Sequence, residues 1–463
     1  MTDLFRHQRG SKWRRRDLHV YLGFVPGGSD AARLALNNRR SNFPRFSMTS
    51  AIAFFPWWAV PEAVPEAVTW GPIRLIPYQR GQAPGDGNGV AQTDLDAMLQ
   101  AYATRPGKPI RRATLLEVDA WRLGEDPEPV LRRFFTAREA IGFAGLAARD
   151  LFEGHFGYGC FHNFSLVVQR YQPGKGDMFA FTMRRRDGGA RHVWSTDEFA
   201  FQCPLHVDSN ARMPPLDAAL VQLLMDDTLP VSWSEAITEY NHANTDSIDV
   251  PTHVEMVMMK SAFELLFGVN PDARSFEHAL TRLLTTIPTP PSPVEGPLAA
   301  KWMQAFPRSS RLYQAWAREF CSRRGAAAHG SKRGAHFVWS EAAHLAFASL
   351  LFPLVLKKLA SEQDRYAISG EDLERLSCID EYLAHEPMDF REDDEQDMPA
   401  KHPWREIDLD IRMRTLSQRM YPQMMAAIEE GLAASNAATG VSDSGTQQLT
   451  GFEEDDGGTH VAP

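Results

Sequence analysis

Residues 312–330 read LYQAWAREFCSRRGAAAHG, and this stretch decides how the C-terminal half of the chain is interpreted. Leu312, Trp316 and Phe320 recur every fourth residue, which is the spacing of side chains on one face of a helix. We therefore predict a helix from Ser309 to about Arg324 that places these three side chains in a core.

Helical spacing recurs throughout the chain from about residue 211 onward. A Pro-rich segment, PTPPSPVEGP at 288–297, interrupts it with a semi-rigid break. We predict an all-α bundle over residues 211–435, with further helices at 216–225, 254–268, 276–287, 298–306, 337–359, 371–385 and 406–434.

Residues 1–210 have the composition of a mixed, β-rich domain, with a possible role as a sensor or recognition module. β-branched and aromatic runs separated by Gly and Pro predict strands, and two helices interrupt them at 93–103 and 128–152. The expected fold class is therefore α+β multidomain, with a disordered acidic tail at 436–463. The predicted strands are 18–24, 73–79, 113–123, 164–171, 178–184 and 193–203.

The bulk composition narrows the range of functions. The chain has 463 residues and a formal net charge of −10, which argues against general affinity for nucleic acid. Its four cysteines lack the spacing of a metal site, so we expect reduced thiols, a cytoplasmic protein and no metal or other cofactor. The apolar run 337–359 contains Glu341, His344 and Pro353, which favours a buried helix over a membrane span.

A basic segment stands out against this acidic background. From Arg308 to Arg333 the sequence has seven Lys or Arg residues and one acid, Glu319, which gives a local charge of +6. Such a segment is either a solvated helix face or a surface that holds a polyanion.

The end of this segment combines two side chains suited to phosphate chemistry. Arg324 and His329 are separated by four residues. Histidine can move a proton near neutral pH, and arginine can stabilise a phosphate through two parallel hydrogen bonds. Both could reach one cleft if the helix frays at Gly325 and Gly330. Read from Arg323 instead, the spacing is five residues.

The segment RRGAAAHG resembles the R-x4-6-H signature of the HEPN superfamily, in particular the Apea-like HEPN group. The upstream stretch VEMVMMKSAFELLFG at 254–268, preceded by YNHANTD, is also similar to that group. The resemblance covers only the C-terminal half, about 211–435. It departs from the family at the residue after the arginine, which is often polar in the family and is Gly325 or Arg324 here.

The resemblance implies a metal-independent endoribonuclease that acts as a homodimer, with two Arg–His pairs facing each other across a two-fold axis. It implies RNA as substrate, a role in antiviral defence or as a toxin-like effector, and no membrane. The alternative is a non-catalytic helical adaptor that binds RNA or a partner protein. A third possibility makes residues 1–210 the enzyme and the bundle a dimerising element.

Each candidate site residue has an expected role. Arg324 and His329 are the candidate catalytic residues, and Arg323, Lys332, Arg333 and Tyr313 are candidates for RNA binding. Tyr313 lies off the apolar row and can stack on a base, whereas Trp316 is assigned to the core. Glu264, within the apolar sequence AFELLF, either holds Arg323 or Arg324 in place or lies on the helix surface. His155, His162 and Cys160 lack an acidic partner at metal-ligand spacing.

Overall fold

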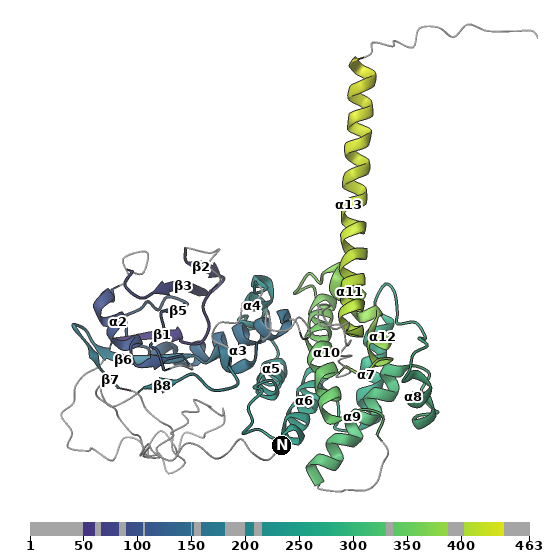
Figure 1. Cartoon of the computed structure of the whole chain (residues 1–463), viewed down its shortest axis with the longest axis horizontal. Coiled ribbons are helices and arrows are strands. Elements are labelled where there is room, and N and C mark those ends of the chain that lie inside the picture. The colour runs from purple at the N-terminus through teal and green to yellow at the C-terminus, as the bar shows by residue number, and fades with distance from the viewer. Residues whose placement is uncertain are drawn as a thin grey trace, which may run out of the picture. The chain divides into compact units, whose positions relative to one another are not determined.

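The structure is a computed structural model, and it describes residues 50–60, 66–82, 89–104, 107–149, 151, 159–180, 200–207, 215–329, 337–387 and 402–438. An antiparallel sheet lies in the N-terminal part, and the C-terminal half is mostly helical (Figure 1). The chain divides into two compact units at Ile407 and Asp408. An α+β architecture is therefore present, as the sequence predicts.

Six strands form the main sheet in the order β2-β3-β5-β1-β6-β7, and every neighbouring pair is antiparallel. A short parallel pair, β4 with β8, lies apart from it. Two helices, α2 (Gln92–Leu99) and α3 (Leu131–Ala148), belong to this part of the chain. The strands are β1 (Ser50–Phe55), β2 (Val68–Trp70), β3 (Ile73–Gln79), β4 (Tyr102–Ala103), β5 (Arg112–Val118), β6 (Val167–Gln172), β7 (Lys175–Ala180) and β8 (Phe201–Gln202).

The central strand β1 was not predicted from the sequence. Its residues, SAIAFF, do not alternate between apolar and polar, because Ala51 to Phe55 are all buried. A strand that is covered on both faces lacks the period-2 pattern by which half-buried strands are recognised.

The strands predicted at 73–79, 113–123 and 164–171 differ from the observed ones mainly at their ends, whereas 181–184 and 193–199 of the two later predictions lie outside the described residues. The prediction at 73–79 matches β3, whereas the one at 113–123 is too long because β5 ends at Val118. The next residue, Asp119, has φ of 51°, a left-handed conformation that breaks a strand. The prediction at 18–24 lies outside the described residues.

The helical half is confirmed in outline. The proline-rich break is present, and α9 extends beyond its predicted end to His329. Helix α5 was missed, and the helix predicted at 371–385 is two short helices that meet at Cys378. The helices are α4 (Ala218–Leu224), α5 (Val231–Ala243), α6 (Thr252–Phe267), α7 (Ala273–Thr285), α8 (Ala299–Ala305), α9 (Leu312–His329), α10 (Glu341–Glu362), α11 (Gly370–Ser377), α12 (Ile379–Leu383) and α13 (Pro403–Ala438).

Helix α10 is the most apolar long helix. Among the described residues it is the one helix that is long and apolar enough to cross a membrane, and 67% of that apolar window is buried inside the protein. Phe347, Leu351 and Val355 have no exposed surface. The helix thus forms part of the protein core, as predicted from the polar residues Glu341 and His344 within its apolar sequence.

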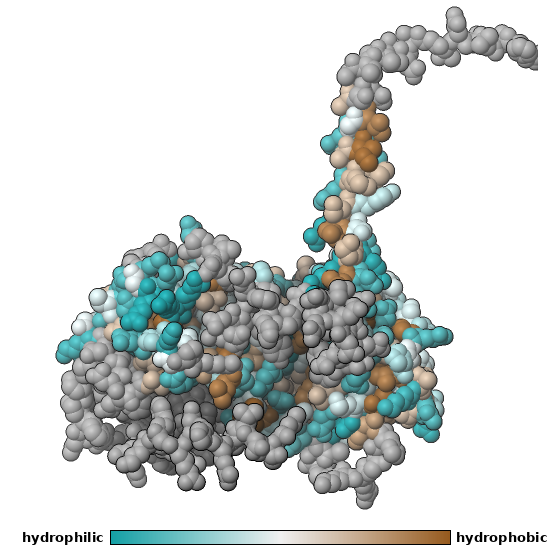
Figure 2. Space-filling view, in the orientation of Figure 1, coloured by the Kyte–Doolittle hydropathy of each residue, from teal (hydrophilic) through white to brown (hydrophobic). Residues whose placement is uncertain are grey.

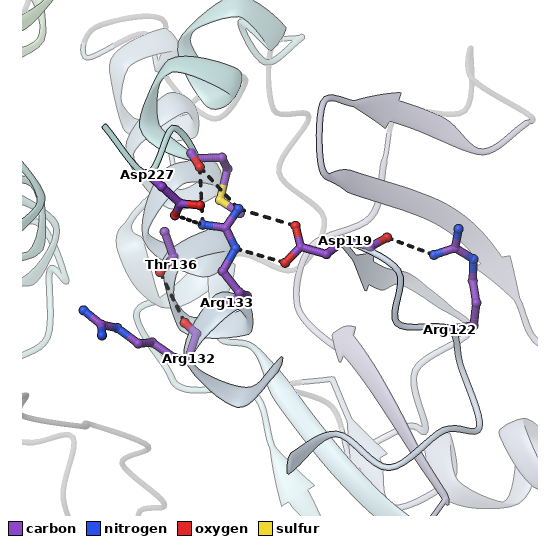
Figure 3. Close-up of polar contacts among 7 residues, drawn as sticks. Asp119, Arg122, Arg132, Arg133, Thr136 and Asp227 are labelled. Atoms are coloured by element: carbon purple, nitrogen blue, oxygen red, sulfur yellow. Dashed lines mark hydrogen bonds and ion pairs between the residues drawn. The ribbon is translucent and has the colours of Figure 1, made fainter. Parts of the chain in front are cut away.

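Arg133 of α3 joins the sheet to the helices (Figure 3). Its Nε donates to Asp119 Oδ2 after β5 at 3.1 Å, and its Nη1 donates to Asp227 Oδ1 after α4 at 2.7 Å. Both terminal nitrogens also lie 3.3 Å from the Met225 carbonyl oxygen. Helix α3 also contacts α4 and α5, so a helix before the predicted 210/211 boundary packs against two helices after it; the boundary itself lies outside the described residues.

Replacing Arg133 with methionine is expected to lower the free energy of unfolding by about 1–2 kcal/mol. The substitution keeps an apolar stem but removes two part-buried hydrogen bonds to the Met225 carbonyl oxygen, together with charge-assisted bonds to Asp119 and Asp227 that water partly screens. Arg132→Met is the matched control, because the Arg132 side chain is exposed and points away from both acids (Figure 3). Urea unfolding of both variants measures the difference, and equal midpoints would contradict the role of Arg133.

Candidate functional site at the end of helix α9

Helix α9 is a core helix over most of its length. Leu312, Trp316 and Phe320 are each buried, which confirms the predicted row and the assignment of Trp316 to the core. The Trp316 and Phe320 rings stack with centroids 4.9 Å apart, and Phe263 of α6 meets both at an edge. The first three turns of α9 are thereby fixed in position, and the end of the helix carries the candidate site.

The helix is continuous through Gly325 to His329, so the predicted fraying at Gly325 is not present. At about 100° per residue, positions five apart on a helix lie about 140° apart around its axis, and positions six apart about 120°. On a continuous helix, the backbone positions 323 and 324 therefore lie on a different side of the α9 axis from position 329. The unwinding at Gly325 that would bring Arg324 and His329 of one chain into one cleft is therefore not present, and Gly330 lies outside the described residues.

Arg323 is already engaged within the protein. Its guanidinium carbon lies 3.7 Å from the centre of the Phe337 ring, and its Nη2 donates to the Trp339 carbonyl oxygen. Burial lowers the pKa of Arg323, although the nearby Glu319 and Glu341 act in the opposite direction. In this conformation Arg323 ties α9 to the start of α10 and is not available for RNA, contrary to its predicted binding role.

Arg324 has a different environment. Its side chain is half-buried, and its Nε, like that of Arg323, is shielded from solvent without a hydrogen-bond partner; unlike Arg323, however, it has no hydrogen bond or ring contact through its other guanidinium atoms among the described residues. No ion pair involves its guanidinium within the described part of the chain. A shielded guanidinium nitrogen without an acceptor is unfavourable and would be satisfied by an anion.

Glu264 does not hold either arginine. It forms an ion pair with Lys260, one turn earlier on α6, whose side chain is only 1% exposed. This pair shields the buried lysine charge. Both proposed roles for Glu264 are corrected, because the carboxylate is 13% exposed and bound to Lys260.

Tyr313 is buried at 5% exposure, so its predicted role in stacking on a base is not supported. Its backbone N–H donates to Asp380 Oδ1 of α12 at 2.8 Å. His329 is the last residue of α9, and Lys332 and Arg333 lie outside the described residues.

A fully buried carboxylate organises the region next to the site. Glu319 accepts hydrogen bonds from the backbone N–H groups of Val338 and Trp339, at 2.8 and 3.0 Å, and from His344 Nε2 at 2.8 Å. Glu319 and His344 have no exposed surface. The carboxylate therefore holds the residues just before α10 against α9.

His344 is neutral in this arrangement. Burial lowers its pKa, and this outweighs the opposing effect of Glu319. The Nε2–H then donates to the carboxylate, while Nδ1 is buried without a partner among the described residues. We did not predict this cluster from the sequence. The one indication of it there is that Glu319 is the only acid between Arg308 and Arg333.

The histidines outside α9 do not assemble a metal site within the described residues, where no group of three potential ligands was found. His162 Nδ1 lies 2.5 Å from His206 Nε2. Burial and the neighbouring His206, Arg138 and His242 lower the pKa of His162 to about 4. Cys160 is a buried thiol whose pKa burial raises to about 12, and His155 lies outside the described residues.

Comparison with protein-family models, curated proteins and solved structures found no match in any of the three.

Proposed function

We propose that the C-terminal half is an HEPN-like domain and that the protein is a metal-independent endoribonuclease. In this proposal Arg324 binds the scissile phosphate and His329 transfers the proton of the attacking 2′-hydroxyl. The products then carry a 2′,3′-cyclic phosphate. A role in antiviral defence or as a toxin-like effector in the cytoplasm rests on the family resemblance alone.

The unpartnered, half-buried guanidinium of Arg324 is the observation that carries the proposal. Every other candidate cation with a described side chain in the C-terminal part of α9 has an internal partner: Arg318 bonds Glu277 at 2.6 Å, and Arg323 bonds the Trp339 carbonyl. An RNA phosphate would supply the acceptor that Arg324 lacks.

Because positions 324 and 329 are about 140° apart around the axis of a continuous α9, the proposal draws Arg324 and His329 from two copies of the chain. If α9 helices from two copies lie side by side, Arg324 of one copy and His329 of the other can contribute to one site. The two-fold arrangement would place two basic helix ends together, which offsets the net charge of −10 for an RNA substrate.

The test is cleavage of a labelled single-stranded RNA by the full chain in the presence of EDTA. We expect His329→Ala and Arg324→Ala each to lower the cleavage rate by at least 100-fold, because proton transfer and phosphate binding both contribute to the transition state. Arg308→Ala is the matched control, since Arg308 is an exposed arginine at the other end of the basic segment, and its rate should stay within threefold.

Thermal unfolding of each variant shows whether the fold is retained. Equal cleavage by the His329→Ala variant and the wild type, or cleavage that EDTA abolishes, would contradict the proposal.

A non-catalytic adaptor is the second candidate, and one observation favours it. Arg323 binds within the protein and α9 is unbroken, so this region also serves as a rigid scaffold. An adaptor predicts RNA or protein binding without cleavage. RNA binding that Arg324→Ala weakens, with no cleaved product under any condition, would favour it over the nuclease.

A further inference from the structure

Helix α13 exposes an apolar face that no other described residue of its compact unit covers. The unit begins at Asp408, and the helix continues to Ala438. Nine large apolar side chains along it are between 37% and 61% exposed. Brown, hydrophobic groups are visible along the helix in Figure 2. They are Leu409, Met413, Leu416, Met420, Tyr421, Met424, Met425, Ile428 and Leu432.

The first part of this face is a straight row. Leu409, Met413, Leu416, Met420 and Met424 follow one another at steps of four, three, four and four residues, so they lie within about 80° of one another around the helix. Tyr421 and Ile428 widen the row on one side. An isolated helix with Pro422 and Gly431 in its interior has little stability of its own in water, and packing of its apolar face normally supplies it.

We propose that α13 of a second copy of the chain packs along this row in antiparallel orientation, with Met420 of both copies at the centre. Positions eighteen residues apart lie five full turns apart and point the same way. Ala427 therefore continues the direction of Leu409, and Gly431 continues that of Met413. In the antiparallel pair Met413 meets Ala427 of the second copy, and Leu409 meets Gly431, so large side chains pack against small ones.

The charge pattern favours the same orientation. Residues 411–428 contain three arginines and no acid, whereas Glu429 and Glu430 follow directly. Antiparallel packing places Glu430 of one helix two residues from the level of Arg412 on the other, whereas parallel packing places each arginine beside its own copy. Arg412 and Glu430 also lie eighteen residues apart, so they belong to one flank of the row and meet across the two-fold axis.

The size of the face sets the expected strength of association. The row with Tyr421 and Ile428 exposes on the order of 700 Å² of apolar side chain per copy, near the lower end of what specific interfaces bury per partner. We therefore expect a dimer with a dissociation constant on the order of micromolar. This inference does not depend on RNA cleavage.

The first test is the molar mass of the full chain between about 1 and 100 µM, measured by sedimentation equilibrium. We expect the wild type to pass from monomer to dimer, and Met420→Asp to weaken association at least tenfold by placing two buried charges at the centre. Gln418→Asp introduces the same charge on the opposite, exposed side of the helix and should leave association unchanged. A wild type that stays monomeric, or a dimer that Met420→Asp does not weaken, overturns the proposal.

The second test measures orientation. A spin label on Ala433→Cys reports the distance between the two copies, with the labelled wild type as background for the four native cysteines. Residue 433 lies thirteen residues from the centre, so at 1.5 Å per residue the antiparallel pair predicts about 40 Å. A distance under about 20 Å would show a parallel pair and overturn the proposed packing.

Discussion

Replacing Glu319 with alanine is expected to lower the free energy of unfolding by about 3–5 kcal/mol. The substitution leaves the N–H groups of Val338, Trp339 and His344 buried without their acceptor, and it leaves a cavity between α9 and α10. Urea unfolding followed by tryptophan fluorescence is a suitable measurement, because Trp316 and Trp339 both lie near the site of the change.

Two further variants separate the carboxylate network from a general effect of charge. Glu319→Gln keeps one acceptor oxygen but places an NH2 group against a backbone donor, so we expect an intermediate loss. Glu341→Gln, on the first turn of α10 and partly exposed, should cost no more than about 1 kcal/mol. A Glu319→Ala variant within 1 kcal/mol of the wild type would show that this network is not a major source of stability.

Replacing Asp380 with asparagine is expected to stabilise the protein by on the order of 1 kcal/mol above pH 6, because the amide never ionises although its NH2 group is left without an acceptor. Burial raises the pKa of this carboxyl to about 6 from an ordinary 3.8, and hydrogen bonds from the backbone of Tyr313 and Leu312 offset the effect only in part. Its Oδ2 is buried without a partner among the described residues. Asparagine keeps the acceptor for Tyr313 and never ionises.

The sign of this effect follows from the two pKa values. The folded state binds the Asp380 proton more tightly than the unfolded state does, so the contribution to stability is complete below about pH 4 and is lost as the pH rises through 6. The advantage of asparagine should therefore grow from pH 4 to pH 6 and stay constant above. Melting temperatures of both proteins across this range test it.

Asp372→Asn is the control for that experiment, because we expect it to lower the stability of the protein where Asp380→Asn raises it. Asp372 is also buried, but its Oδ2 lies 3.0 Å from Lys357 Nζ, so removing its charge leaves a poorly exposed lysine unpaired. We expect this variant to be less stable than the wild type at pH 7.5. An Asp380→Asn variant that loses stability as Asp372→Asn does would contradict the account of Asp380.

Features of the fold that depend on neighbouring residues could be predicted from the sequence. The row of Leu312, Trp316 and Phe320 is a local pattern, and it identified the buried face of α9. Strand β3 was placed because Ile73–Gln79 has both strand composition and flanking turn signals. By contrast, β1 is covered on both faces, so no alternation marks it.

The errors at the candidate site have a common physical cause. Tyr313 was predicted to be accessible because it lies off the row of Leu312, Trp316 and Phe320. However, α9 contacts α6, α7, α8 and α12, so more than one of its faces is buried. Glu264 was matched with a distant arginine although Lys260, four residues earlier, was the nearer partner. The bonds from Glu319 to Val338, Trp339 and His344 join segments about twenty residues apart, and no periodic pattern encodes them.

The central claim is that Arg324 of one copy and His329 of another form one RNA-cleaving site. Mixing the Arg324→Ala and His329→Ala chains, after dissociation and reassembly, tests it most directly. Each variant alone has no complete site, whereas a mixed dimer has one.

At equal amounts, half of the dimers are mixed, and each has one of its two sites intact. We therefore predict that the mixture recovers about a quarter of the wild-type rate of RNA cleavage in EDTA. A mixture as inactive as its two components, under conditions in which the wild type cleaves, would contradict a site shared between copies.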